Sequence, residues 1–144
     1  MAFLNYTNLV LRASAATSGA SEQDAAVTLP ESVGAIWVVV EKTAEANADN
    51  LLTVRLQSQV DSVWFDLGWS SITTTQALAT AADLTVDATR KNNILDVDNT
   101  TPTYRVVAHF EALPSNIVRI ASVSSGTGAA NTFSAKAHFV LNRF

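Results

Sequence analysis

From residue 35 to the end of this 144-residue chain, apolar and polar residues alternate in short runs. Successive side chains of a β-strand point to opposite faces, so this two-residue period predicts strands with one buried and one exposed face. Glycine, asparagine and aspartate, the residues that favour turns, separate the runs at intervals of roughly ten residues, which is typical of an antiparallel sandwich. We therefore expect a single all-β domain, an antiparallel β-sandwich of jelly-roll type.

The order of the runs predicts how the strands connect. Residues 52–59 alternate most clearly, and Asp61 and Ser62 form a tight turn into a returning strand over residues 63–69. The last three long strands are expected at residues 104–112, 117–124 and 132–141. Because short loops join them, we expect a meander of antiparallel hairpins. Short strands are also expected at residues 84–86 and 94–97, and residues 71–83 are expected to form a loop with at most one helical turn.

Residues 35–41 form a nearly continuous apolar, β-branched run. Such a run is typical of a strand that is covered on both faces, as in the middle of a sandwich. On this interpretation Trp37 is a core residue, because tryptophan is the largest filler of a hydrophobic core.

The first thirty residues differ from the rest, so we divide the chain into residues 1–30, an N-terminal arm with the first strand, and residues 31–144, the sandwich domain. Residues 3–11 and 26–29 have strand patterns, and small polar residues separate them. One interpretation is an extended arm that reaches a partner. The alternative is an ordinary first strand followed by a loop.

Composition restricts the classes of function. Charged residues make up only 15% of the chain, against roughly 25% in average domains, so much of the surface is neutral. Neutral surfaces are common in proteins that live in assemblies, although a sandwich with a plain surface has the same composition. The net charge is −4 and the basic residues are dispersed, which argues against nucleic acid as a partner.

The start of the chain and its apolar runs bear on where the protein acts. The first ten residues lack the features of a signal peptide, and no run of ~18 apolar residues predicts a membrane span. We expect a protein that is made in a cytoplasm and has no membrane partner.

Few residues offer chemistry. The chain has no cysteine, which excludes a disulfide, a thiolate zinc site and a catalytic thiol. His109 and His138 lie in different strands on polar faces, where solvent-facing side chains are favoured over a metal site that lacks a third ligand. Asp96 and Asp98 could supply oxygen ligands to calcium, but a turn capped by its own side chains is favoured. No nucleophile motif occurs, so we expect no enzyme, no cofactor and no metal.

Two tryptophans support a second hypothesis. Trp64 and Trp69 flank a turn and could form an aromatic platform for a sugar ring. The chain would then be a carbohydrate-binding module, with calcium at Asp96 and Asp98 as an optional addition.

The segment from Leu52 to Leu67 resembles small structural proteins of tailed bacteriophages. In that family a strand of the form L-x-V-x-(L/V)-Q-x-S runs into a hairpin of the form S-x-D-G-x-x-W-x-D-L. Here Gln57, Asp61, Trp64 and Asp66 occur in the same order, and Ser62 stands where glycine is usual. The later segments 105–108 and 133–139 match the family's R-V-x-(A/V) strand and its Phe-rich last strand, so the resemblance covers roughly residues 35–140.

The resemblance implies a structural virion protein, a head decoration (cement) protein on the capsid surface. Its partners would be the major capsid protein and further copies of the chain, with a homotrimer favoured and a dimer possible. A tail tube or baseplate component is the alternative within phage particles. The residues we expect to contact a partner are those of the arm: Phe3, Leu4, Tyr6, Leu9 and Leu11.

Overall fold

The computed structural model describes residues 3–17, 21–31, 33–45, 51–74, 95–96, 104–125 and 131–143. Within these ranges all regular structure is β-strand, and no helix there is long and apolar enough to cross a membrane. The strands are β1 (Phe3–Ala16), β2 (Ser21–Gln23), β3 (Val27–Thr28), β4 (Ile36–Glu45), β5 (Leu51–Val60), β6 (Val63–Asp66), β7 (Ser71–Thr74), β8 (Leu95–Asp96), β9 (Tyr104–Phe110), β10 (Ile117–Ser125) and β11 (Asn131–Arg143).

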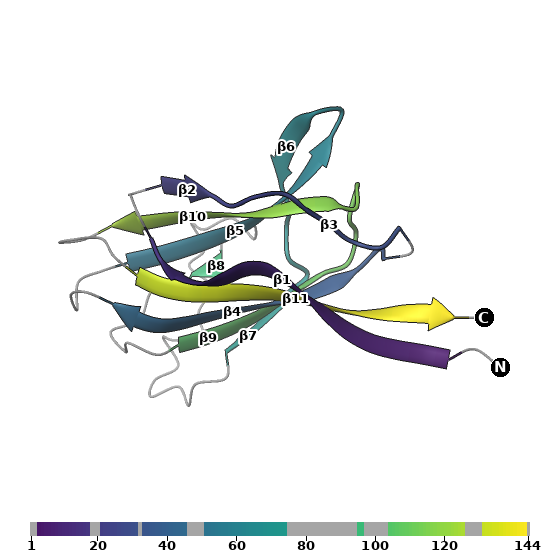
Figure 1. Ribbon diagram of the computed structural model, residues 1–144, viewed down its shortest axis with the longest axis horizontal. Coiled ribbons are helices and arrows are strands. Elements are labelled where there is room, and N and C mark those ends of the chain that lie inside the picture. Colours follow the sequence, from purple (N-terminus) through teal and green to yellow (C-terminus); the bar gives the residue numbers. More distant parts are fainter. Residues whose placement is uncertain are drawn as a thin grey trace.

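The strands form two sheets that pack face to face (Figure 1). Sheet A has the order β1-β11-β4-β9-β7, and sheet B has the order β2-β10-β5-β6, with β3 on β10 and β8 on β5. Every recorded strand pair is antiparallel. The prediction of an all-β antiparallel sandwich is confirmed, and the jelly-roll connectivity stays a prediction.

The core lies between the sheets and follows the alternation in the sequence. Leu52, Val54 and Leu56 of β5 are fully buried, and so are Val118 and Ile120 of β10. Sheet A contributes the alternate residues of its three central strands. These are Ile36, Val38, Val40, Val106, Ala108, Phe110, Phe133, Ala135, Ala137 and Phe139.

The predicted meander of the last three strands is wrong. β9 and β11 both lie in sheet A, where β4 separates them, whereas β10 lies in sheet B and pairs with β5. Each connection therefore crosses from one layer to the other. Loops of this length suffice for either route, because stacked sheets lie only about 10 Å apart. Loop length alone therefore does not select the pairing partner.

The β5–β6 hairpin has the predicted turn. Asp61 and Ser62 have φ angles of 49° and 64°, both in the left-handed region, and Val60 pairs with Val63 across them. Two left-handed residues match the twist of the flanking strands in a two-residue hairpin loop. The returning strand is shorter than predicted, because Leu67 turns into the core and its N–H donates to the carbonyl of Leu56 at 2.9 Å.

Both sheets include strands from the first thirty residues. β1 pairs with β11 from Phe3 to Ala16, and β2 and β3 pair with β10 in sheet B. Residues 71–74, expected in a loop, form β7 at the edge of sheet A, because their backbone pairs with β9. The predicted strand 84–86 and the predicted helical turn after residue 75 lie outside the described residues.

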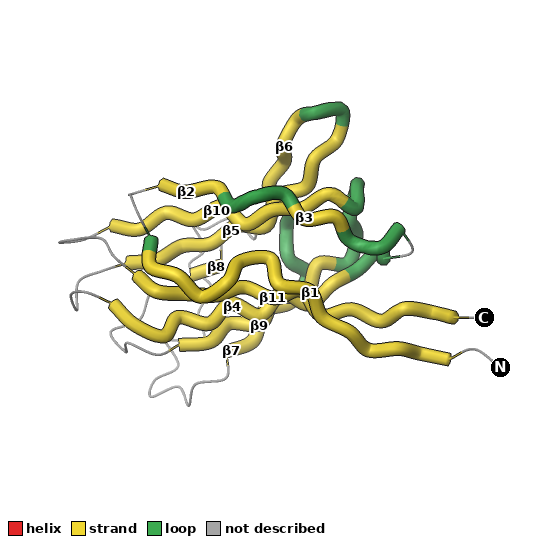
Figure 2. The backbone as a smooth tube through the Cα atoms, viewed as in Figure 1, coloured by secondary structure: helices red, strands yellow, loops and turns green. Residues whose placement is uncertain are grey.

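β1 and β11 run past the rest of sheet A. β4 pairs with β11 only as far as His138, whereas β1 stays paired with β11 as far as Arg143. Residues 3–7 and 139–143 therefore form a two-stranded ribbon, which we call the terminal ribbon. It carries both chain ends side by side away from the sandwich (Figure 2).

Candidate interaction site

The outer face of sheet A exposes an aromatic residue at its centre. Trp37 on β4 is 44% exposed, so the prediction that it lies in the core is wrong. Its neighbours along the strand, Ile36 and Val38, are buried, because only one face of β4 meets sheet B. The sequence held a signal for this orientation: Glu41 shares the alternation of Trp37, whereas Ile36, Val38 and Val40 on the other face are apolar.

A row of polar and aromatic side chains crosses the sheet at Trp37. His138 on β11 and His109 on β9 are its cross-strand partners. The His109 ring stacks on the indole, with centroids 3.9 Å apart and planes at 18°. Both histidines lie on the outer face, as the alternation predicted.

Ser70, His109 and Glu111 do not have the arrangement of a catalytic triad. Ser70 Oγ lies 3.2 Å from His109 Nδ1, and Glu111 Oε1 lies 3.9 Å from the same nitrogen. A catalytic histidine binds the nucleophile and the orienting carboxylate through different ring nitrogens. The Ser70 hydroxyl also donates to the carbonyl of His109 at 3.1 Å. These contacts hold the imidazole against Trp37.

His138 completes the row on the other side of Trp37. Partial burial lowers the pKa of His138 below its ordinary value, and the positive charge of Lys136 lowers it further. The neutral imidazole is therefore favoured, which reduces the charge beside the exposed indole.

Exposed apolar side chains surround this row. Val10 on β1 and Val140 on β11 are each 47% exposed. Val39 and Val107 are half-buried on the same face, and the exposed Lys136 lies between Val10 and Val39 in the register. We call Val10, Trp37, Val39, Val107, Val140 and Lys136 the sheet A patch.

A second apolar surface lies on the β5–β6 hairpin, which projects from sheet B in Figure 1. Phe65 pairs with the buried Ser58, and Val63 pairs with Val60, so their side chains share the face that forms the core farther along β5. Phe65 is nevertheless 51% exposed and Val63 is 53% exposed. The hairpin thus extends past the part of sheet B that sheet A covers, so the side chains on its core-facing side are exposed.

The opposite side of this hairpin is polar and paired. The Arg119 guanidinium lies 4.1 Å from the centroid of the Trp64 ring, and Arg119 also donates to Gln57. Asp66 accepts hydrogen bonds from Arg55 at 3.1 Å and from Gln57 at 2.8 Å. These contacts fix the direction of the hairpin and leave its apolar side exposed.

The two tryptophans of the sugar-binding hypothesis do not form a common platform. Arg119 covers one face of Trp64, and Trp69 packs against the core. Asp96 has a described backbone only, and Asp98 lies outside the described residues. Within the described residues no three His, Cys, Asp or Glu side chains group as metal ligands would.

The predicted partner-binding residues divide into two groups. Leu11 is 4% exposed in the core and Leu9 packs against it, so these two stabilise the sandwich and do not form a free arm. Phe3, Leu4 and Tyr6 lie in the terminal ribbon by their backbone pairing with β11, and their side chains lie outside the description. The sequence analysis missed Val10, Trp37, Val140, Val63 and Phe65.

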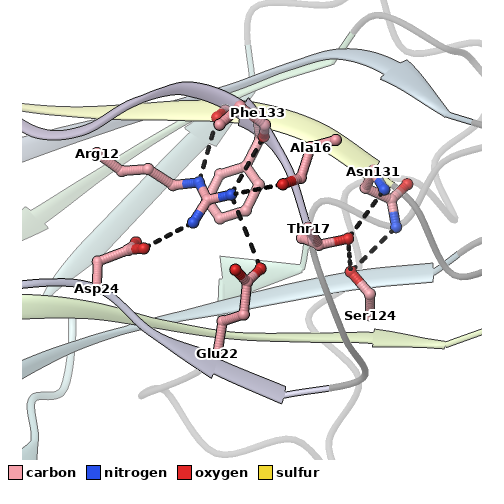
Figure 3. Close-up of polar contacts among 9 residues, drawn as sticks. Arg12, Ala16, Thr17, Glu22, Asp24, Ser124, Asn131 and Phe133 are labelled. Atoms are coloured by element: carbon pink, nitrogen blue, oxygen red, sulfur yellow. Dashed lines mark hydrogen bonds and ion pairs between the residues drawn. The ribbon is translucent and has the colours of Figure 1, made fainter.

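A buried arginine joins the edges of the two sheets (Figure 3). Arg12 on β1 is 7% exposed, and its Nη1 donates to Asp24 Oδ1 at 2.7 Å, just beyond β2. Its Nη2 lies 3.8 Å from Glu22 and donates to the carbonyl of Ala15 at 3.1 Å. The guanidinium also covers the Phe133 ring at 4.1 Å from the centroid. Burial raises the pKa of Asp24, and the Arg12 charge and hydrogen bond oppose that rise.

Farther along the same edge, a second buried polar contact joins the layers. Ser124 Oγ donates to Thr17 Oγ1 at 3.2 Å, and Thr17 Oγ1 accepts the backbone N–H of Asn131 at 3.1 Å. The Arg12 contacts and the Thr17 contacts both link the two sheets, so we infer that they stabilise the fold.

No protein-family model, curated protein or solved structure matches the chain.

Proposed function

We propose that this chain is a structural virion protein, a decoration or cement protein that binds the outer surface of a phage head between subunits of the major capsid protein. The sequence resemblance over residues 35–140 supports the phage particle as its location. The observation that carries the proposal of partner binding is the terminal ribbon. It extends past sheet A and presents a long strand edge, as the contact between a small sandwich and a shell requires.

The edge of β1 suits pairing with another chain. Residues 3–10 keep a continuous register with β11 and include no charged residue and no proline, and β1 is the last strand of sheet A in the described structure. Natural edge strands that stay unpaired usually carry charges, prolines or bulges. The register shifts in β1 occur only after Val10. An extended segment of a capsid subunit could add to this edge through backbone hydrogen bonds.

The apolar side chains on the surface agree with life in an assembly. The sheet A patch and the hairpin together expose five large apolar side chains. Apolar surface gathered in patches marks sites where proteins meet, whereas single exposed residues carry no such meaning.

The alternative of a sugar-binding module is weaker on this geometry. Sugar rings stack on open aromatic faces, but His109 covers one face of Trp37 and Arg119 covers one face of Trp64. A tail tube or baseplate component would use the same surfaces, but its copies would form a different assembly.

Binding to bare phage heads tests the proposal. The chain is mixed with heads built from a major capsid protein of the phage that encodes it, and co-sedimentation measures the bound fraction. Deletion of residues 1–6 should abolish binding, because it removes most of the β1 strand of the terminal ribbon. A longer deletion is unsuitable, because Leu11 and Arg12 belong to the folded body.

The matched control is Val123→Ser, which changes an exposed valine on β10 of sheet B, away from the ribbon. Its binding should equal that of the wild type. Thermal unfolding confirms that both variants are folded. Undiminished binding by the deletion variant would show that the ribbon is not the contact, and failure of the intact chain to bind heads would reject the proposed function.

A further inference from the structure

We propose that copies of this chain associate head to tail, with the apolar side of the β5–β6 hairpin of one copy docked on the sheet A patch of the next. This inference goes beyond the proposed function and does not depend on it, because it concerns the free protein. The occupant of the sheet A patch is a second copy of the chain.

The two surfaces account for almost all of the exposed large apolar residues that are described. Val10, Trp37 and Val140 lie on the sheet A patch, and Val63 and Phe65 lie on the hairpin. The remaining one, Val123, stands by itself on sheet B. A single type of contact between copies would therefore remove both patches from water, and burial of apolar area is the main driving force of association.

One molecule cannot cover its own patches. The hairpin projects from sheet B away from sheet A in Figure 1, whereas the patch lies on the outer side of sheet A, so the two surfaces lie on separate parts of the chain. A contact between two different surfaces is heterologous, because each copy uses its hairpin on one neighbour and its patch on another. Such contacts close into a ring when the rotation between copies permits.

The two surfaces also carry opposite charges. Asp61 is exposed at the hairpin turn, and Lys136 is exposed within the patch, so docking brings these charges together. The receiving face spans the five strands of sheet A, so it is wide enough for the two strands of the hairpin to lie on it.

The test uses one variant for each surface. Val63→Ser with Phe65→Ser removes the apolar side of the hairpin, and Trp37→Ser removes the centre of the patch. Light scattering at up to about 100 μM chain should show an oligomer for the wild type and a monomer for each variant. Each variant should raise the dissociation constant by about thirtyfold or more, as buried aromatic anchors do.

Mixing the two variants gives the decisive result. The hairpin variant keeps an intact patch, and the patch variant keeps an intact hairpin, so an equimolar mixture should form dimers containing one copy of each and nothing larger. A contact between two hairpins would leave the patch variant able to associate by itself, and a contact between two patches would leave the hairpin variant able to do so. Association that appears only on mixing therefore identifies a contact between hairpin and patch. Val123→Ser should behave as the wild type, and unfolding curves exclude misfolded variants.

Three results would overturn the inference: a wild-type chain that stays monomeric at the highest concentration, loss of association in only one of the two variants, or a mixture that does not associate. Because head binding is measured separately, the proposed function and this inference can fail independently.

Discussion

Arg12 and Trp37 lie on neighbouring parts of sheet A and reverse the usual distribution of side chains. Arg12 carries a charge and is 7% exposed, whereas Trp37 is a large aromatic residue and is 44% exposed. Charged residues are almost never fully buried unless they are paired, and large exposed apolar patches are rare on monomers. Each exception therefore needs its own cause.

The causes differ in where the partners come from. Arg12 finds its partners within the chain: the carboxylates of Glu22 and Asp24, backbone carbonyls and the Phe133 ring. Trp37 stacks on His109 and is still 44% exposed. Arg12 therefore has its interaction partners within the monomer, whereas Trp37 leaves apolar surface that another molecule can bury. Changes at the first site should affect folding, and changes at the second should affect association.

The largest expected effect is that of Arg12→Ala. It leaves two half-buried carboxylates without their cation and removes the contact with Phe133, so we expect unfolding free energy to fall by about 3–5 kcal/mol. Chemical denaturation measures the change. Arg55→Ala is the control, because Arg55 pairs with Asp66 at the surface, and its loss should cost at most about 1 kcal/mol. Equal losses for the two variants would contradict the special role of the buried site.

The pH dependence of Asp24 gives a smaller, directional effect. Burial raises the pKa of Asp24 above its ordinary value of 3.8 in the folded chain, in the presence of Arg12 and Glu22. The folded state then binds more protons than the unfolded state between the two pKa values, so the contribution of Asp24 to stability falls as pH rises through that window.

Asp24→Asn removes this titration. The unfolding free energy of the wild type minus that of the variant should therefore increase as pH is lowered from neutral towards 3.8. Denaturation curves at a series of pH values measure the difference. A difference that decreases on acidification would mean that the Arg12 charge outweighs burial.

Trp37→Ala should have little effect on folding. The indole is nearly half exposed, and the substitution removes one stacking contact, that with His109. The free energy of unfolding should therefore fall by no more than about 1.5 kcal/mol. Phe110→Ala on the buried side of sheet A is the reference, with an expected loss of about 3–5 kcal/mol. Similar losses at the two positions would show that Trp37 belongs energetically to the core.

Ser62→Gly should give the smallest effect, with the opposite sign. Ser62 has a φ of 64°, which glycine adopts without the steric cost that a side chain brings. We expect a gain of about 0.5–1 kcal/mol in thermal or chemical unfolding, with head binding and association unchanged. A loss of stability would indicate that the Ser62 side chain makes a favourable contact in the turn.

Much of the fold follows from local pattern. The alternation of residues 52–59 correctly predicted which side chains of β5 face the core, and Asp61 with Ser62 correctly predicted the hairpin turn. The same alternation placed His109 and His138 on the outer face. These features depend on the two-residue period and on the backbone preferences of single residues, which neighbouring positions in the sequence reveal.

The candidate site was harder to predict. An apolar run such as residues 35–41 is compatible with a strand that is covered on one face or on both, and the length of the run does not decide between them. The prediction that Trp37 lies in the core assumed that both faces are covered. The exposure of Phe65 depends on where sheet A ends relative to β5. The burial of Arg12 depends on Phe133 of β11, which lies 121 residues away along the chain.

Local sequence pattern was enough to predict the all-β class, most of the strands, their inward faces and the tight turn. The pairing of β10 with β5 instead of β9, the open face of β4 and the burial of Arg12 became clear only from the three-dimensional arrangement. The physical reason is that strand formation and side-chain direction are local properties, whereas pairing and burial depend on which distant segments come together and where each sheet stops covering the other.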